Sequence, residues 1–316
     1  MTAKETPQPL LATKQAMKLM GNHFEITVVA ENADWANEKI AKAVIEIQRI
    51  ESLLTTYSPT SQTHIINENA GIAPVKVSLE VLQLIQRSKQ ISALTQGAFD
   101  ISYGSIDKRF WNFDKTMTSL PDAKTAKKMI RLVNYRNIIV NEEGQTVFLI
   151  EPGMRIGFGG IGKGYAAEQA KLLLQKLGVK SGIVNASGDL TAWGNQPNGQ
   201  PWTIGIAHPD SARFPFSYLN MSNMAVATSG NYEKFVLING KKYSHTINPK
   251  TGLPITGIKS VTIICPNAEM ADAMATPVTI MGIEAGLFLV NQFKGIGCII
   301  IDDFNKVFTS KNIRLK

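Results

Sequence analysis

The chain of 316 residues is 44% hydrophobic with a mean hydropathy of −0.02, which is typical of a folded globular protein and excludes a disordered one. Its net charge is +8, but the lysines are scattered and no basic run alternates with aromatic residues, so the sequence pattern of a nucleic-acid-binding protein is missing. The charge instead favours a solvated surface with some preference for anionic ligands.

The cysteines and the N-terminal residues bear on the compartment. Cys265 and Cys298 lie in apolar, strand-like runs without metal-ligand spacing, so we expect buried free thiols. No apolar stretch is long enough to span a bilayer, and the first twenty residues lack the hydrophobic core and cleavage site of a signal peptide. The sequence therefore allows a cytoplasmic protein or one whose export segment has been removed.

Taken in chain order, the elements predict an α+β fold. Residues 1–15 are polar, contain two prolines and predict a disordered lead-in, which leaves a single large domain over 16–316. Residues 55–71 are rich in turn formers and predict a loop, and residues 99–104 a loop or short strand. Apolar residues at helical spacing predict helices at 33–54, 79–97, 122–133, 165–178, 268–281 and 283–292. Strand-like runs lie at 23–30, 182–187, 202–207, 224–229, 233–238, 259–265, 298–303 and 306–309, with a hairpin over 137–153.

A glycine loop precedes the helix at 165–178. Gly157, Gly159 and Gly162 satisfy G-x-G-x-x-G, but the acidic residue that a dinucleotide-binding unit requires about twenty residues later is absent, and Asp189 comes too late. Because Gly164 follows Lys163, the loop is not a Walker A motif either. Two interpretations remain: glycines that let backbone N–H groups approach a phosphate, or glycines that only permit tight packing.

Three residues further along are candidates for catalysis. Asp272 and Thr276 lie four apart on one helix face, where a carboxylate and a hydroxyl, with a loop carbonyl such as that of Gly160, would be hard oxygen ligands for Mg²⁺. The alternative is that Asp272 is a surface residue of an Ala-rich helix. His245 lies in a strand before a Pro-Gly turn, and is either structural or a base that takes a proton from a hydroxyl.

The order of these motifs is similar to that of the ApbE family, the FAD:protein FMN transferases, from Leu19 to about Gly282. The matching stretches are MGNHFEITV, YSPTSQTHIIN, FDISYG, GFGGIGKGYAAE, VNASGDL, ATSGNYEKF, HTINPKTGLP and ADAMAT. The resemblance implies an ApbE-like (T-fold-like) domain of mixed sheets flanked by helices.

The resemblance also implies Mg²⁺-dependent cleavage of FAD, with transfer of FMN to a Thr or Ser hydroxyl on a partner flavoprotein and release of AMP. By motif, Gly160, Asp272 and Thr276 would hold the metal, and His245 would activate the hydroxyl. The residues expected to contact FAD are Met20, Tyr57, Trp111, Asn112, Phe113, Gly157 and Lys163.

The chain departs from the family pattern at several positions. Gly157 replaces the aspartate that usually begins the glycine loop, Ser187 replaces the first glycine of a Gly-Gly-Asp turn, and Pro277 is unusual. The segment from Trp111 to Phe113 aligns only after a one-residue slip. Two alternatives to the transferase remain: an FAD pyrophosphatase that releases FMN and AMP, which would share every motif, or a non-catalytic FAD carrier, which the missing carboxylate at Gly157 makes plausible.

The partner and the location follow from the resemblance alone. The chain has no Asp-x-x-Ser/Thr-Gly-Ala-Ser/Thr stretch of its own, so the acceptor would be a separate flavoprotein that carries this motif. Family members commonly work outside the cytoplasm on a lipid anchor, which implies a periplasmic or membrane-anchored protein, with a cytoplasmic one as the alternative. No nucleic-acid partner is expected.

Overall fold

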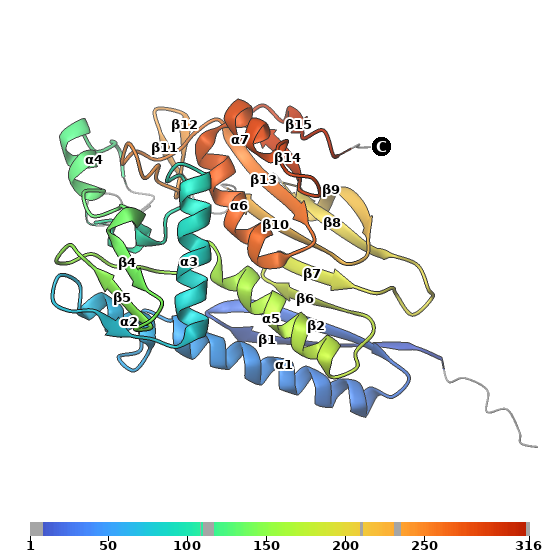
Figure 1. Cartoon of the computed structure of the whole chain (residues 1–316). Coiled ribbons are helices and arrows are strands. Elements are labelled where there is room, and N and C mark those ends of the chain that lie inside the picture. Colours follow the sequence, from blue (N-terminus) through green and yellow to red (C-terminus); the bar gives the residue numbers. More distant parts are fainter. Residues whose placement is uncertain (1–8, 108, 110–116, 209–210, 231–234, 314–316) are drawn as a thin grey trace, which may run out of the picture.

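The computed structural model describes residues 9–107, 109, 117–208, 211–230 and 235–313. An eight-stranded sheet forms its centre, in the order β1-β2-β6-β7-β10-β13-β14-β15 (Figure 1). Each pairing in this sheet is antiparallel. Its strands are β1 (Leu11–Leu19), β2 (Asn22–Ala30), β6 (Gly182–Ala186), β7 (Asp189–Trp193), β10 (Met224–Gly230), β13 (Ile258–Cys265), β14 (Gly297–Asp302) and β15 (Val307–Thr309).

Helices cover one face of this sheet. The amphipathic helix α1 (Ala33–Leu54), together with α5 (Gly162–Lys176) and α6 (Ala268–Met281), packs on it, and α5 lies between the other two (Figure 1). Helix α3 (Leu79–Leu94) contacts α6, and α7 (Ile283–Val290) follows α6 and contacts β14. The main hydrophobic core lies between these helices and the sheet.

A hairpin of β8 (Trp202–His208) and β9 (Ser211–Met221) covers the other face with a second hydrophobic cluster. Strand β13 shows the consequence in its sequence, because Ile263 and Cys265 belong to the helix-side core while Ile264 belongs to the hairpin-side cluster. A strand buried on both faces reads as a continuous apolar run, which explains the segment VTIIC. Cys265 and Cys298 are buried free thiols, as expected.

Smaller elements are added at one end of the molecule. They comprise the three-stranded sheet of β3 (Val75–Lys76), β5 (Thr146–Leu149) and β4 (Ile138–Asn141), the short helix α2 (Gln62–Glu68) and the 3₁₀ turns η1 (Ile101–Ser105) and η2 (Tyr135–Asn137). Helix α4 (Ala123–Met129) and the hairpin of β11 (Phe235–Ile238) and β12 (Lys241–Ser244) share a third hydrophobic cluster. In Figure 1, α4, β11 and β12 occupy one corner of the molecule.

The α+β class predicted from the sequence is confirmed, but two local expectations are wrong. Residues 11–15 are not part of a disordered lead-in, because they form the first half of β1, whose exposed edge position tolerates polar residues. Residues 55–71 are not entirely loop, because Ser61 caps α2 by accepting a hydrogen bond from the backbone N–H of His64. Residues 99–104, expected as loop or strand, contain η1. Among the described residues, no helix is both long and apolar enough to cross a membrane.

Candidate functional site

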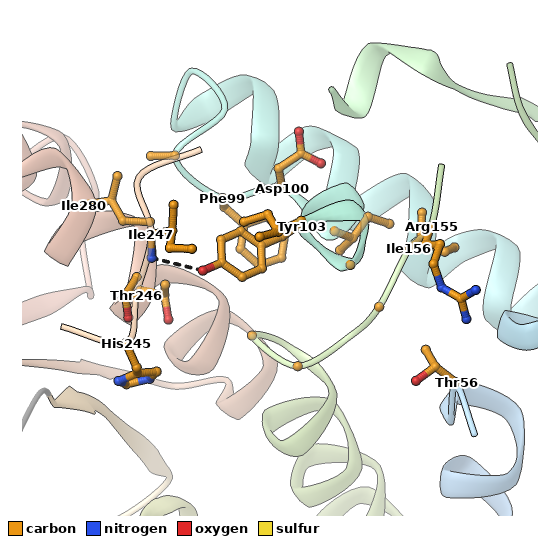
Figure 2. Close-up of a pocket in the computed structure, with 18 residues that line it drawn as sticks. Thr56, Phe99, Asp100, Tyr103, Arg155, Ile156, His245, Thr246, Ile247 and Ile280 are labelled. Carbon is orange, nitrogen blue, oxygen red and sulfur yellow. Dashed lines mark hydrogen bonds between the residues drawn. The ribbon is translucent and has the colours of Figure 1, made fainter. Parts of the chain in front are cut away.

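A pocket of about 450 Å³ opens where segments far apart in the sequence meet. Its walls come from residues 98–106 around η1, from residues 155–160 before α5, from residues 245–247 after β12, and from Thr276 and Ile280 on α6 (Figure 2). The pocket therefore joins the glycine loop, the histidine segment and the Asp–Thr helix, the three features that the sequence analysis singled out.

Two side chains hold the loops that form opposite walls. The amide of Asn67 makes two hydrogen bonds with the backbone of Ile156, at 2.7 and 3.0 Å, and so fixes the chain entering the glycine loop. The hydroxyl of Tyr103 accepts a hydrogen bond of 3.0 Å from the backbone N–H of Ile247 and so fixes the segment that carries His245 (Figure 2). Asn67 and Tyr103 therefore maintain the shape of the pocket, because a shift of either loop would change it.

The aspartate of the FDISYG segment, Asp100, stabilises the local backbone. Asp100 accepts hydrogen bonds from the backbone N–H and hydroxyl of Ser102 and from the backbone N–H of Tyr135. Burial raises the pKa of Asp100, and these hydrogen bonds oppose that rise. The carboxyl group thus caps η1 and ties it to η2, which positions Tyr103 beneath the pocket.

The glycines of this loop lie in two different surroundings. Gly157, Gly159 and Gly160 line the pocket, where ligand contact stays a prediction. Gly164 lies instead at the contact between α5 and α6, where a Cβ atom would come within 2.2 Å of the carbonyl oxygen of Ala268. The dinucleotide-binding interpretation is excluded as expected, because the strands that follow α5 pair antiparallel.

A buried cluster of charges lies beside the start of α5. Asp272 accepts a hydrogen bond of 2.9 Å from the backbone N–H of Gly164, and Lys163 forms an ion pair with the buried Asp189. Burial, and then the neighbouring Asp189 carboxylate, raise the pKa of Asp272 to about 7. Burial thus favours the protonated form of this carboxyl group, which lies one helical turn before a pocket-lining threonine, whereas a cation bound there would favour the ionised form.

The structure brings four of the predicted residues to the pocket wall, namely Gly157, Gly160, His245 and Thr276. Other residues that were predicted to contact FAD lie outside the pocket wall. Met20 lies against the start of α5, where its Cε is 3.7 Å from the Cβ position of Gly162, while Tyr57 is 94% exposed. The expected FAD contacts at Trp111, Asn112 and Phe113 lie outside the described residues.

Sequence reasoning missed several residues of the site. Asn67 and Tyr103 act through backbone partners that only the fold supplies, and the position of Asp189 in the Ser187-Gly188-Asp189 turn gave no sign of its ion pair with Lys163. Arg155 also lines the pocket and pairs with Glu68 at 3.4 Å. The FDISYG segment was a signal for Tyr103, but a single arginine before a glycine loop gave none for Arg155.

Comparisons with known proteins identify the family of the chain. A model of the ApbE family matches residues 20–300. A curated protein of Klebsiella pneumoniae named FAD:protein FMN transferase is 31% identical over 89% of this chain and 87% of its own length. A Salmonella typhimurium protein of the same name is 28% identical over 95% of this chain and 88% of its own length.

Solved structures show the same fold. The crystal structure of the ApbE protein from Thermotoga maritima superposes with a TM-score of 0.85 at 26% identity, over 96% of this chain and 98% of that one. The apo form of the Pseudomonas stutzeri flavinyl transferase ApbE superposes with a TM-score of 0.83 at 25% identity, over 96% of both chains.

Proposed function

Because the chain belongs to the ApbE family, we propose that it is an FAD:protein FMN transferase, which joins the FMN half of FAD to a Thr or Ser hydroxyl of a partner flavoprotein. The observation that carries the proposal is the convergence in one pocket of the glycine loop, His245 and Thr276, with Asp272 one turn away on the same helix. A pure flavin carrier needs neither a base nor a buried carboxylate next to its pocket.

The residues present fit a magnesium ion. Asp272 supplies a carboxylate, Thr276 a hydroxyl at the pocket wall and Gly160 a backbone carbonyl, and hard oxygen donors of this kind suit Mg²⁺. Among the described residues, no group of three or more His, Cys, Asp and Glu side chains is placed to bind a metal, so the proposed site has Asp272 as its one carboxylate ligand. When bound there, the ion would neutralise pyrophosphate charge and orient the phosphorus for attack.

His245 would act as the general base. In the proposed step its imidazole takes the proton from the acceptor hydroxyl, whose oxygen forms a bond to the phosphorus of the FMN half. The phosphorus–oxygen bond to the AMP half breaks, and AMP leaves with the bonding electrons. Tyr103 would keep this geometry constant, because it fixes the backbone two residues beyond His245.

The flavin contacts are part of the same proposal. Met20, Tyr57, Gly157 and Lys163 are expected to contact FAD by family motif, as is the segment 111–113. Arg155 on the pocket wall adds a cation close to Gly157, where the family usually carries an aspartate, and favours an anionic ligand there.

The acceptor would carry the Asp-x-x-Ser/Thr-Gly-Ala-Ser/Thr motif. A location in the periplasm, on a lipid anchor in the precursor, is the one that the family suggests. Cell fractionation with antibodies against the native protein would test it: recovery in the periplasmic or membrane fraction supports this location, and recovery with cytoplasmic markers contradicts it.

The test of the activity is an incubation of the protein with FAD and an acceptor domain that bears the motif, with and without Mg²⁺. Intact-mass spectrometry follows the acceptor, while chromatography follows AMP and free FMN. The expected result is an Mg²⁺-dependent FMN adduct with an equal amount of AMP. The variant Asp272→Ala should abolish both, and unchanged AMP release by that variant would refute the metal site.

Two other outcomes would overturn the transferase. AMP together with free FMN and no adduct would identify a pyrophosphatase, in which water replaces the acceptor hydroxyl. Bound FAD that stays intact in the presence of acceptor and Mg²⁺ would identify a carrier, and would point to the missing carboxylate at Gly157 as the reason.

A further inference from the structure

The positive charge of the chain is concentrated in two segments beside the pocket. Residues 117–136 and 235–257 together contain eight of the 33 Lys and Arg residues but one of the 25 Asp and Glu residues. That one acid, Asp122, caps α4 through the backbone N–H groups of Lys124 and Thr125. The rest of the chain is almost neutral, so the lysines that look scattered along the sequence are not evenly distributed in space.

The two segments form one structural unit. Met129 of α4, Val236 and Ile238 of β11 and Ile247 belong to one hydrophobic cluster. The loop after His245 also lies directly on α4, since a Cβ atom at Gly252 would come within 2.1 Å of the carbonyl oxygen of Ala126. The exposed cations on this unit, which we call the basic surface, are Lys124, Lys127, Lys128, Arg131, Arg136, Lys241, Lys242 and Lys250.

The basic surface adjoins a second cavity that shares a lining residue with the pocket. This cavity of about 380 Å³ lies between residues 248–258 and the end of α6, and Ile280 lines both cavities. Its walls carry the side chains of Asn248, Thr251 and Thr279 next to aliphatic ones. A mixed lining of this kind suits an extended polypeptide, which presents both amide groups and side chains.

We propose that the basic surface docks an acidic face of the acceptor flavoprotein, whose acceptor segment then enters through the second cavity toward His245. This inference rests on the proposed transferase activity and adds the chemistry of the partner. Opposite charges around a binding site raise the association rate, and the effect weakens as salt screens it. Because the cations surround the loop that carries His245, they would attract the partner to the place where its hydroxyl reacts.

The test compares two double variants of equal charge change. Lys124→Glu with Lys127→Glu alters the basic surface. Lys176→Glu with Lys180→Glu alters two exposed lysines, one at the C-terminal end of α5 and one just after it, and controls for the change in net charge. The probe is one acceptor domain in two forms, with exposed acids around its motif or with these acids replaced by Asn and Gln. The measured quantity is kcat/KM for FMN transfer at about 20 and 300 mM salt, spanning weak and strong screening.

At low salt we expect the first double variant to lower kcat/KM for the acidic acceptor about tenfold, while the control changes it less than twofold. The difference should vanish at high salt and with the neutralised acceptor, and the affinity for FAD should stay unchanged in both variants. Equal effects of the two double variants, or none, on an enzyme that still transfers FMN would overturn the docking surface and leave the transferase intact.

Two further outcomes would also refute the inference. If the first double variant lost binding to phosphatidylglycerol vesicles but kept its kinetics with the acidic acceptor, the basic surface would serve a membrane instead. If the unaltered chain transferred FMN to neither acceptor form, the proposed function would fail, and this inference with it.

Discussion

The contact between α5 and α6 gives a sharp prediction at Gly164. Its backbone N–H donates to the carboxylate of Asp272, and a Cβ atom there would lie 2.6 Å from the Cβ of Asp272 and 2.2 Å from the carbonyl oxygen of Ala268. Backbone and Cβ atoms cannot rotate away as the end of a long side chain can. The substitution Gly164→Ala therefore has to push the two helices apart by about 1 Å to restore van der Waals contact.

The expected loss of stability has three parts. Overpacking of a buried contact destabilises by about 1–3 kcal/mol. A weakened hydrogen bond to a charged group adds about 1.5–3 kcal/mol if it is lost completely. The substitution also stabilises the helix by about 1 kcal/mol, because alanine has a higher helix propensity than glycine. The net loss is about 1.5–5 kcal/mol, which for a chain of this size lowers the melting temperature by roughly 2–8 °C.

The activity should fall more steeply than the stability. Moving Asp272 by about 1 Å misplaces a proposed metal ligand, and a displacement of that size lowers a catalytic rate about a hundredfold. Thermal unfolding and FMN transfer at saturating FAD and Mg²⁺, both on the purified variant, measure the two effects.

Gly159→Ala provides the matched control for stability. Gly159 belongs to the same loop, but a Cβ atom there meets nothing within 4 Å. We expect its melting temperature to stay within about 2 °C of that of the unaltered chain, as is usual for exposed positions. If Gly164→Ala melted like this control and retained full transfer activity, the close contact between α5 and α6 would not position Asp272.

Three other predictions follow from the same site. Because the pKa of Asp272 is raised to about 7 in the folded chain, its protonated form contributes stability that is fully present below the unfolded pKa near 4 and is lost, without Mg²⁺, as the pH rises through 7. Asp272→Asn should therefore flatten the dependence of the melting temperature on pH between 5 and 8. An unchanged slope of melting temperature against pH would contradict the raised pKa. Tyr103→Phe leaves the backbone N–H of Ile247 without its acceptor, which should destabilise by about 1–3 kcal/mol in urea unfolding and lower kcat, and a variant with unaltered stability would show that this hydrogen bond is dispensable. His245→Ala should lower kcat for transfer by about 10²–10⁴ with little change in KM for FAD, and a rate within threefold of the original would exclude a general base at this position.

The sequence alone determined the class of fold, most of the elements and the family. Periodicity placed α1, α3 and α5, since their apolar residues repeat along a single chain segment and need no distant partner to be recognised. Motif order likewise selected His245, Asp272 and Thr276 before any distance was known. The sequence did not predict the first half of β1, because an exposed edge strand that contains lysines has the composition of a disordered segment.

Only the tertiary structure decided which glycines pack closely against a neighbouring element and which charged side chains are buried in ion pairs. Gly160 and Gly164 both lie in the stretch GFGGIGKG, yet one lines the pocket and the other packs against α6, because the approach of a second helix is a property of the fold. The same reason separates Lys163, paired with a buried aspartate, from Lys124 and Lys127, which lie exposed on α4. Burial and partner distance set the chemistry of each side chain, and both depend on residues more than a hundred positions away, as Gly164 and Asp272 show.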